Sequence, residues 1–487
     1  MVPLTPWVAL PAVSVVAVLL AYAGRYGFHR DELYFIESMR HPAWGYIDNP
    51  SLTPAIGWVS RQLFGDSLVG LRVLPALEVG VLVVVVAVLA RELGADRFAQ
   101  RLAAVLAATS SFFLAIGHLL TTPTLDVLIT ALVLLGLVRI VRTGEQRWWL
   151  AVGLAVGLGL ENKYTLALVL VAVAVAALIT GAWRRLVSWW MVAGTLVALS
   201  VWAPQLWWQI DHGWPQFEFA RAIAGDEGGE NRATLVPFQL LIVGPPLVPI
   251  VLAGLWSLWS RPAWRSVRFV ALGYVVLLAA LLVTGGKGYY SAGLFPVVIA
   301  AGAIATNDWT DRGRRPVARQ WIVGVAILVN FAIGAVITLP ILPASSVDGP
   351  IGAANEDALE TIGWPDFVAQ VAAAVPAADR DDVVILVEDY GMAGAIDRFG
   401  PSFGLPRAYS GHNSYADFGT PPGSAGPVLV VGHVLAVASW WIENCQLVGT
   451  VDTIEGIEND VDGEPIFLCA SPAEPWERLW PLLSRYG

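Results

Sequence analysis

The first stretch of the chain whose residues could do chemistry is 28–35, which reads FHRDELYF. Asp31 and Glu32 supply two carboxylates there, and His29 and Arg30 supply two bases. The stretch follows the first long apolar run, so these side chains come where a membrane helix has just left the bilayer. A carboxylate at a membrane surface could accept a proton from a substrate held at the lipid boundary. We therefore expect Asp31 and Glu32 to be catalytic and Arg30 to bind a phosphate of the substrate.

Three distant residues are candidates for the same site. Lys163 and Lys287 are the only lysines in the chain, and both fall at predicted outer ends of helices. A compact ammonium beside flexible glycine backbone suits a phosphate oxygen, although a lysine reaching from a helix end toward the lipid headgroups is the simpler alternative. Asp126 falls in the first turn of a predicted helix, where the helix dipole also favours a carboxylate, and it lies on the same outer surface as Asp31.

Together these groups suit the transfer of a glycosyl group from a lipid phosphate. In such a reaction the sugar becomes oxocarbenium-like, the acceptor hydroxyl loses a proton and the departing phosphate gains negative charge. One carboxylate and one or two cations meet these needs, and no general acid is required because the phosphate leaves as a stable anion. We expect no cofactor and no metal site, although His29, Asp31 and Glu32 could hold a divalent cation.

Two other function classes stay open. A transporter or flippase would move a lipid-linked sugar without bond chemistry, and the intramembrane acid Glu78 and the glycine-rich helices would suit it. No inverted repeat is visible in the sequence, however, and the distinctive polar residues cluster outside the bilayer. A non-catalytic scaffold whose acidic outer part binds partners is the third class, and loss of activity in a folded Asp31→Asn variant would exclude it.

The elements that must position these residues are membrane helices. Of the 487 residues, 56% are hydrophobic and 14% are charged, and the mean hydropathy is +0.63. About eleven apolar runs are long enough to cross a bilayer. Their cores are 6–23, 68–90, 99–117, 124–141, 148–162, 165–181, 187–207, 236–257, 266–284, 289–306 and 320–340. The first run lacks a basic N-terminal region and a convincing cleavage site, so we expect a membrane helix there and not a signal peptide.

Arginines set the expected orientation, because cytoplasmic loops retain positive charge. They gather in the predicted turns at 91–101, 139–147, 184–185, 261–268 and 312–319. This pattern places the N-terminus in the cytoplasm. It places a first outer loop (25–66), a second outer loop (209–235) and the whole acidic tail outside.

The two outer loops could both serve the site. The first outer loop should carry two short helical pieces, one beginning near Asp31 and an amphipathic one over 52–64 that lies in the membrane interface. The second outer loop is polar and interrupted by glycine, and it could cover a lipid-embedded substrate as a movable lid. We expect His212 and Trp214 in that loop to contact the acceptor, although a plain connecting loop is an equally simple reading.

Residues 345–487 are predicted to form a separate, water-facing domain after the membrane domain of residues 1–344. They contain 5 Lys and Arg against 21 Asp and Glu, and this low content of basic residues argues against a nucleic-acid partner. Short apolar runs at 383–387, 428–431, 447–451 and 466–469 and a helical run at 368–374 predict an α/β domain. Its two cysteines, Cys445 and Cys469, could form a disulfide outside the cytoplasm or stay as two buried thiols.

Four motifs carry a resemblance to a known family. They are residues 27–35 (GFHRDELYF), 41–50 (HPAWGYIDNP), 160–164 (LENKY) and 286–290 (GKGYY) with the following FP at 295–296. In these motifs, and over about residues 20–340, the chain resembles the bacterial branch of glycosyltransferase family 39. That family is related to protein O-mannosyltransferases and to the lipid A aminoarabinose transferase, and it has the GT-C membrane fold. The tail motifs at 388–391 and 410–415 depart from the extra domains of the mannosyltransferases, which leaves the acceptor open.

The resemblance implies an all-α polytopic membrane protein of GT-C type, here with a C-terminal extracytoplasmic α/β domain. It implies inverting transfer of a sugar from a polyprenyl-phosphate donor to a glycan, lipid or protein acceptor, at the outer face of the cytoplasmic (inner) membrane. The residues that it assigns to the site are Asp31 as general base, Asp126 as a second acid, and Lys163, Lys287 and Tyr290 at the lipid phosphate.

Overall fold

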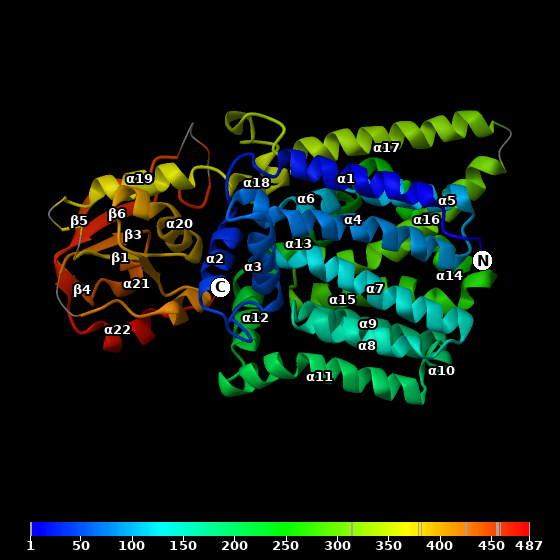
Figure 1. Ribbon diagram of the computed structural model, residues 1–487, viewed down its shortest axis with the longest axis horizontal. Helices are drawn as coiled ribbons and strands as arrows, with labels where there is room; N and C mark the ends of the chain where they lie inside the picture. Colours follow the sequence, from blue (N-terminus) through cyan, green and yellow to red (C-terminus); the bar gives the residue numbers. More distant parts are fainter. Residues whose placement is uncertain are drawn as a thin grey trace.

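Apolar helices that run side by side form a bundle in the first 340 residues (Figure 1). The structure is a computed structural model and describes residues 2–486 apart from 313–314, 378, 381, 424–425, 454–456 and 458 and the side chains at 226, 437 and 438. Six of the described helices are long and apolar enough to cross a membrane: α4 (Leu68–Leu93), α7 (Thr122–Thr143), α11 (Trp189–Asp211), η3–α15 (Pro262–Thr284), η4–α16 (Gly288–Asp311) and α17 (Pro316–Thr338). Two bent pairs raise this number to eight: α5–α6 (Arg97–Ala108 and Ser111–His118) and α13–α14 (Gly228–Val243 and Pro245–Ser260).

Three shorter apolar helices complete the bundle: η1–α1 (Pro6–Tyr22), α8 (Trp148–Leu160) and α9 (Thr165–Thr180). Each predicted apolar run coincides with one of these helices or bent pairs to within about two residues at either end or lies inside it, which confirms the mostly helical architecture. By length and composition, six to eight of the described helices and bent pairs could cross a membrane, so the predicted number of eleven spans is not confirmed. The reason is geometric: α8 and α9 have 13 and 16 residues, and at about 1.5 Å per residue neither covers a hydrocarbon core of about 30 Å.

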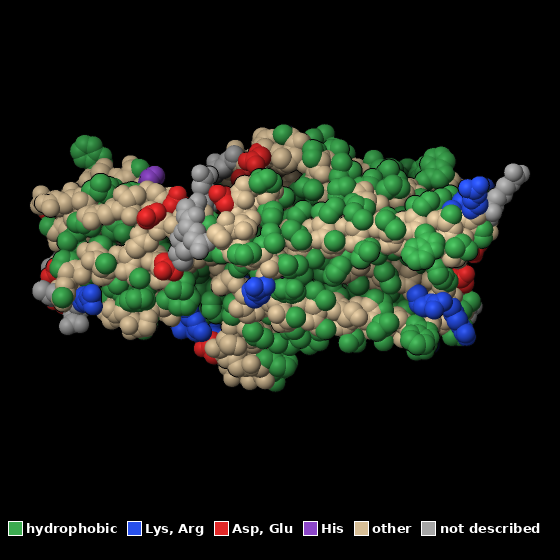
Figure 2. Space-filling model, turned by 90° about the horizontal axis from the view of Figure 1, so that it is seen from above, with side chains coloured by type: hydrophobic (Ala, Val, Ile, Leu, Met, Phe, Trp, Pro, Cys, Tyr) green, Lys and Arg blue, Asp and Glu red, His purple; other side chains and the backbone are tan. Residues whose placement is uncertain are grey.

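The flanks of the bundle expose large apolar side chains. Hydrophobic atoms cover most of its length in Figure 2, and the lysines and arginines gather mainly at the end that carries the N-terminus in Figure 1. Trp207 is 71% exposed, Val283 77% and Trp321 71%. Side chains of this size are buried or cluster at binding surfaces in water-soluble proteins, so lipid contact accounts for this belt.

The other end of the bundle carries two short helices, α2 (Arg30–Arg40) and α3 (Leu52–Phe64), which lie beside the C-terminal domain (Figure 1). Both helices were expected, and α3 has the predicted bounds. A capping box fixes the first turn of α2. The Nδ1 atom of His29 accepts a hydrogen bond from the backbone N–H of Asp31 (3.1 Å), and Glu32 Oε2 accepts one from the backbone N–H of His29 (2.9 Å).

The segment 209–235 is helical, so the prediction of a polar loop there is wrong. After α11 ends, α12 (Pro215–Asp226) runs at the same end of the bundle as α2, and α13 follows it (Figure 1). Gly213 and Trp214 have positive φ angles of 73° and 65°, which breaks the chain between α11 and α12. Pro215 then suits the first position of a helix because its φ is already fixed there.

The C-terminal part folds around a five-stranded sheet with the order β2-β1-β3-β6-β5. Its strands are β1 (Val384–Val387), β2 (Ala408–Ser410), β3 (Val428–Val431), β5 (Gln446–Thr450) and β6 (Pro465–Cys469). β1 pairs parallel with β2 and β3, whereas β6 is antiparallel to β3 and β5. The four predicted apolar runs are all strands, the helical run lies in α19 (Trp364–Ala374), and a Cys445–Cys469 disulfide is present. β2 was not predicted because its three residues are too few for a visible pattern.

The sheet is buried on both faces. Ile385 and Leu429 pack in one hydrophobic cluster with α19, α20 (Tyr390–Phe399) and α2, whereas Leu386 and Val430 pack with α22 (Trp476–Leu483). The first cluster therefore joins the C-terminal domain to α2. Close backbone approach makes this possible: a Cβ atom on Gly394 of α20 would lie 3.0 Å from the carbonyl carbon of Leu33 in α2.

A buried ion pair fixes α2 to the membrane helices. Arg72 of α4 donates from Nε to Glu32 Oε1 (2.8 Å) and from Nη2 to Glu32 Oε2 (2.7 Å), and the two side chains are 1% and 0% exposed. Glu32 also accepts a hydrogen bond from the backbone N–H of Leu120 (3.0 Å), and Arg72 donates to the carbonyls of Ala23 (2.9 Å) and Gly27 (2.8 Å). Glu32 is thus fully engaged by protein groups.

Replacing Arg72 by Met should destabilise the protein by about 3–5 kcal/mol, because Glu32 then stays buried without its charge partner. Arg478→Met is the matched control, since it breaks a pair with Glu474 whose side chains are 76% and 55% exposed. Thermal unfolding in detergent compares the variants. An Arg72→Met protein as stable as wild type would contradict a structural role for Glu32.

Candidate active site

A cavity of about 140 Å³ lies where the end of the bundle meets the C-terminal domain. Its lining residues are Asp31, Tyr34, Phe35, Asp48, Asn49, Thr122, Lys163, Tyr164, Phe219, Ile223, Lys287, Tyr289, Tyr290, Tyr390 and Asn413. The cavity therefore brings together segments from α2, the 41–50 turn, the starts of α7 and α9, α12, the 287–290 segment and the C-terminal domain. The two lysines and five tyrosines give it a cationic and aromatic wall.

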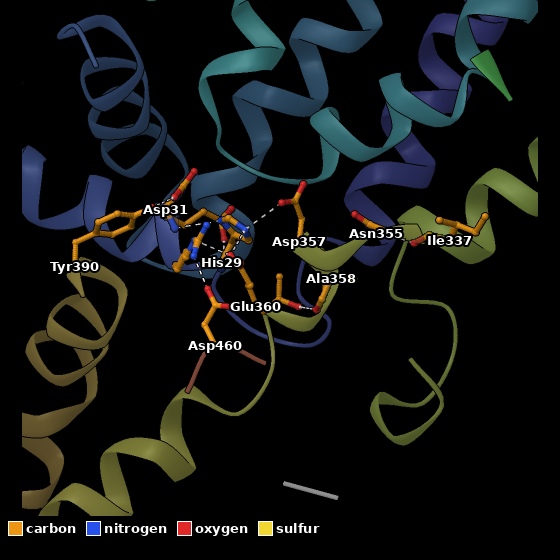
Figure 3. A network of polar contacts seen from close by, with 12 residues as sticks. His29, Asp31, Ile337, Asn355, Asp357, Ala358, Glu360, Tyr390 and Asp460 are labelled. Atoms are coloured by element: carbon orange, nitrogen blue, oxygen red, sulfur yellow. Dashed lines mark hydrogen bonds and ion pairs between the residues drawn. The ribbon is translucent and has the colours of Figure 1, made fainter. Parts of the chain in front are cut away.

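Asp31 lies in the first turn of α2 and meets the C-terminal domain. The hydroxyl of Tyr390, the first residue of α20, donates a hydrogen bond to Asp31 Oδ1 (2.9 Å) (Figure 3). The ring of Tyr390 also packs against that of Tyr34, with 4.7 Å between the centroids. Asp31 is thus held from both sides of the junction. Its side chain accepts a hydrogen bond from Tyr390 of the C-terminal domain, and its backbone N–H donates one to His29 at the start of α2.

A second carboxylate, Asp48, lines the cavity near Asp31. The hydroxyl of Tyr34 donates to Asp48 Oδ1 (2.6 Å). Burial, with a smaller contribution from the charge of Asp31, outweighs this hydrogen bond and raises the pKa of Asp48 to about 7. The sequence assigned Asp48 no role, and its only signal was its place in the 41–50 motif.

Lys163 reaches the cavity from the turn between α8 and α9. Its Nζ donates to Thr122 Oγ1 (3.1 Å) and to the hydroxyl of Tyr289 (3.3 Å), and it lies 4.8 Å and 5.2 Å from the ring centroids of Tyr289 and Tyr290. Burial lowers the pKa of Lys163, and the charge of the nearby Asp126 opposes this effect. The direct contacts of the ammonium are neutral hydroxyls and aromatic rings, which an anion could displace.

Lys287 is held by a residue of the helical segment that was expected to be a loop. Its Nζ lies 2.9 Å from Glu227 Oε2 and 3.2 Å from Oε1. Glu227 connects α12 to α13, and Phe219 and Ile223 of α12 line the cavity. Helix α12 thus covers the cavity through Phe219 and Ile223, and Glu227 at its end pairs with the lining residue Lys287.

The structure brings together four of the nine predicted site residues: Asp31, Lys163, Lys287 and Tyr290. Asp126 lies close to Lys163 and is 8% exposed, but it is not one of the described lining residues. Neither His212, which stacks on Trp208 at 4.2 Å, nor the half-exposed Trp214 is among them. Glu32 lies in the buried pair with Arg72, as described above.

Arg30 serves the domain junction instead of the cavity. Its Nε lies 2.7 Å from Glu360 Oε2, and its Nη1 pairs with Asp460. His29 Nε2 lies 3.1 Å from the same oxygen of Glu360 and 3.8 Å from Asp357 Oδ1 (Figure 3). His29 and Glu32, which could have held a cation together with Asp31, both have protein partners here.

This network gives His29 an unusual charge state. Burial by itself would lower the pKa of His29, but hydrogen bonds to Asp357 and Glu360 and the charge of Asp31 outweigh it and raise the pKa well above its ordinary value. Burial raises the pKa of Glu360 to about 7. The pKa values of His29 and Glu360 are thus both higher in the folded protein than in the unfolded chain.

Comparison with known proteins places this geometry in context. Residues 48–208 match the model of the family described as dolichyl-phosphate-mannose-protein mannosyltransferase. The undecaprenyl phosphate-alpha-4-amino-4-deoxy-L-arabinose arabinosyl transferase 1 of Pseudomonas fluorescens strain Pf-5 is 30% identical over 272 residues, which cover 52% of this chain and 48% of that protein. Its counterpart in strain Pf0-1 is 28% identical over 302 residues, which cover 58% and 52%. The matched regions thus span about half the length of these relatives.

Two solved structures of ArnT from Cupriavidus metallidurans superpose on 95% of the chain. The apo structure has a TM-score of 0.58 at 15% identity and covers 95% of this chain and 97% of that one, and the structure bound to undecaprenyl phosphate has a TM-score of 0.56 at 15% identity with 95% and 98% covered. The chain has the fold of ArnT. This confirms the predicted resemblance to GT-C glycosyltransferases related to ArnT and the mannosyltransferases.

The stability that the His29 network contributes should fall as the pH rises. A pKa that is higher in the folded protein stabilises it below the unfolded value, about 6.5 for histidine and 4.3 for glutamate, and this contribution is lost as the pH rises through the folded value. We therefore expect the unfolding temperature of wild type to exceed that of His29→Gln most below about pH 6.5 and progressively less as the pH rises from there. His212→Gln, at a half-exposed histidine, is the control. A constant margin across this range would contradict the assignment.

Proposed function

We propose that this chain is an integral membrane glycosyltransferase that moves a sugar from a polyprenyl-phosphate donor to an acceptor hydroxyl on the outer face of the cytoplasmic membrane. The observation that carries the proposal is the cavity, which gathers Asp31 with both lysines of the chain although 256 positions separate the first from the last. The ArnT fold supports it, since one of the ArnT structures is bound to undecaprenyl phosphate.

Asp31 is the general base in this mechanism. It accepts the proton of the acceptor hydroxyl, whose oxygen attacks the anomeric carbon from the side opposite the phosphate, so the configuration inverts. The hydrogen bond from Tyr390 orients the carboxylate of Asp31. Asp48, with its raised pKa, takes the neutral or charged form near neutral pH and hydrogen-bonds a sugar hydroxyl.

Lys163 and Lys287 stabilise the departing phosphate. Lys163 exchanges Thr122 and Tyr289 for phosphate oxygens, and Lys287 exchanges Glu227 for them. These two cations, with the hydroxyl of Tyr290, supply the charge that the leaving group needs, so the proposal requires no metal at Asp31.

We propose further that all eleven apolar segments lie in the membrane, with the N-terminus in the cytoplasm. The short helices α8 and α9 pack beside the longer α7, α11 and α15, and their loops lie at the same levels (Figure 1). Residues 1–344 then form the membrane domain, and 345–487 form the extracytoplasmic domain. The arginine-rich turns at the other end and the Cys445–Cys469 disulfide support this orientation.

In this proposal α12 covers the site. Phe219 and Ile223 of α12, and not His212 and Trp214, then contact the acceptor. Displacement of Glu227 from Lys287 by the donor phosphate frees the connection between α12 and α13. The helix can then shift over the acceptor, which is a hydroxyl of a glycan, a lipid or a protein.

Asp31→Asn should lower the rate of sugar transfer by about 10²–10⁴-fold while donor binding persists, because the amide cannot accept the proton. The assay follows labelled sugar from a panel of polyprenyl-phosphate sugars to crude envelope acceptors in nanodiscs. Asp452→Asn, an exposed acid of the outer domain, is the control. If wild type and Asp31→Asn bind the lipids yet are equally inert with every acceptor, the enzyme proposal fails and transbilayer movement becomes the next assay.

Lys163→Gln and Lys287→Gln should each weaken binding of the donor lipid by about 10–100-fold, because each removes a charge-assisted hydrogen bond of about 1.5–3 kcal/mol. Arg25→Gln removes a basic residue that lies outside the described cavity lining and should bind like wild type. Binding is measured with a fluorescent polyprenyl phosphate. Equal affinity in all four proteins would remove the lysines from the phosphate site.

Tyr390→Phe should lower kcat by about 10-fold with little change in KM, because Asp31 loses one hydrogen bond to its charged form. Tyr409→Phe in β2 is the control. An unchanged kcat would show that the C-terminal domain does not position the base.

A further inference from the structure

A second group of metal-ligating side chains lies on the C-terminal domain, outside the cavity. Glu388 follows β1, His433 follows β3, and Glu464 precedes β6. Parallel β1 and β3 end at the same edge of the sheet, and antiparallel β6 begins there. The topology therefore brings the three side chains together, although 76 positions separate the first from the last.

The ligand atoms of the three residues already lie close to one another. One atom from each side chain falls within 4.8 Å of the others, and His433 Nδ1 lies 3.5 Å from Glu464 Oε2. Ligands about 2.0–2.2 Å from a metal ion are about 3–4 Å apart, so small side-chain rotations close the set. Glu464 Oε2 is buried and accepts no hydrogen bond from the described residues, which leaves its lone pairs for a ligand.

A glycine lets the two carboxylates approach. Gly432 has φ of 90°, and a Cβ atom there would lie 2.7 Å from Glu388 Oε2 and 3.3 Å from Glu464 Oε2. No other residue would fit at this position without moving both side chains. The backbone N–H of the next residue, His433, donates to Glu388 Oε2 (2.5 Å) and holds that carboxylate in place.

The electrostatic surroundings also favour a cation. The charges of Asp389 and Asp460 act on Glu464 in addition to that of Glu388. Arg485 Nη1 lies 3.5 Å from Glu388 Oε1 and Arg30 pairs with Asp460, whereas the ion-pair partner of Glu464 among the described residues is His433 of the same group. A divalent ion would relieve the remaining repulsion.

We propose that Glu388, His433 and Glu464 bind one first-row divalent cation, such as Zn²⁺ or Mn²⁺, with water completing the coordination shell. One imidazole with two carboxylates suits these ions better than Ca²⁺, which takes six to eight oxygen ligands. The ion ties the connection between β1 and α20 to β3 and β6. Glu388 lies two residues before Tyr390, so the site stiffens the segment that delivers Tyr390 to Asp31.

The test uses tag-free, full-length protein in detergent, stripped with a chelator and titrated with Zn²⁺ or Mn²⁺ in separate experiments. We expect one ion per wild-type chain after gel filtration, measured by elemental analysis, and binding at least about 10-fold weaker in His433→Ala and Glu464→Gln. Because His433 is 64% exposed, its replacement should leave the metal-free unfolding temperature unchanged. Mn²⁺ bound to wild type should show nitrogen hyperfine coupling that His433→Ala lacks.

Two controls isolate the site. His212→Ala removes another half-exposed histidine beside an acid, and Glu474→Gln removes an exposed acid of the same domain. Both should bind like wild type. Binding below one ion per chain, or binding that is the same in His433→Ala as in wild type, would overturn the proposal. No outcome depends on sugar transfer, so the experiment separates this site from the proposed activity.

Discussion

The buried pair of Glu32 and Arg72 is the constraint on which the site depends. A helix as polar as α2 can lie against an apolar bundle only if its inward charge is satisfied, and Arg72 meets that need with two hydrogen bonds. Successive residues of a helix point about 100° apart, so fixing Glu32 inward turns its neighbour Asp31 toward the cavity. The more deeply buried carboxylate of the adjacent pair is thus bound to Arg72, and the other lines the cavity.

The C-terminal domain is part of the site and not an appendage. Its α20 shares a hydrophobic cluster with α2, and its Tyr390 binds Asp31. The pairs that Arg30 and His29 make with Glu360 anchor the same junction from the other side of α2. Any movement of the domain against the bundle would therefore change the hydrogen bonding of the proposed base.

Both lysines have partners that a phosphate could replace. Lys163 rests on hydroxyls and aromatic rings, and Lys287 pairs with Glu227 at the junction of α12 and α13. This arrangement holds each ammonium in position by protein contacts, and it links the proposed phosphate site to α12 through Glu227. Weak, exchangeable contacts are suited to a site that must bind an anion and release it.

The sequence alone determined the membrane helices, the strands of the tail and four lining residues, because long apolar runs and isolated lysines are local signals. Apart from the family resemblance, which assigned the base to Asp31, the two adjacent acids look alike, and only the pairing of Arg72 with Glu32 shows which of them is buried. Nor could the sequence predict Asp48 or Tyr390 in the cavity, or helix α12 in place of a loop. Those assignments depend on contacts between residues up to 359 positions apart, which only the packing of the bundle against the sheet decides.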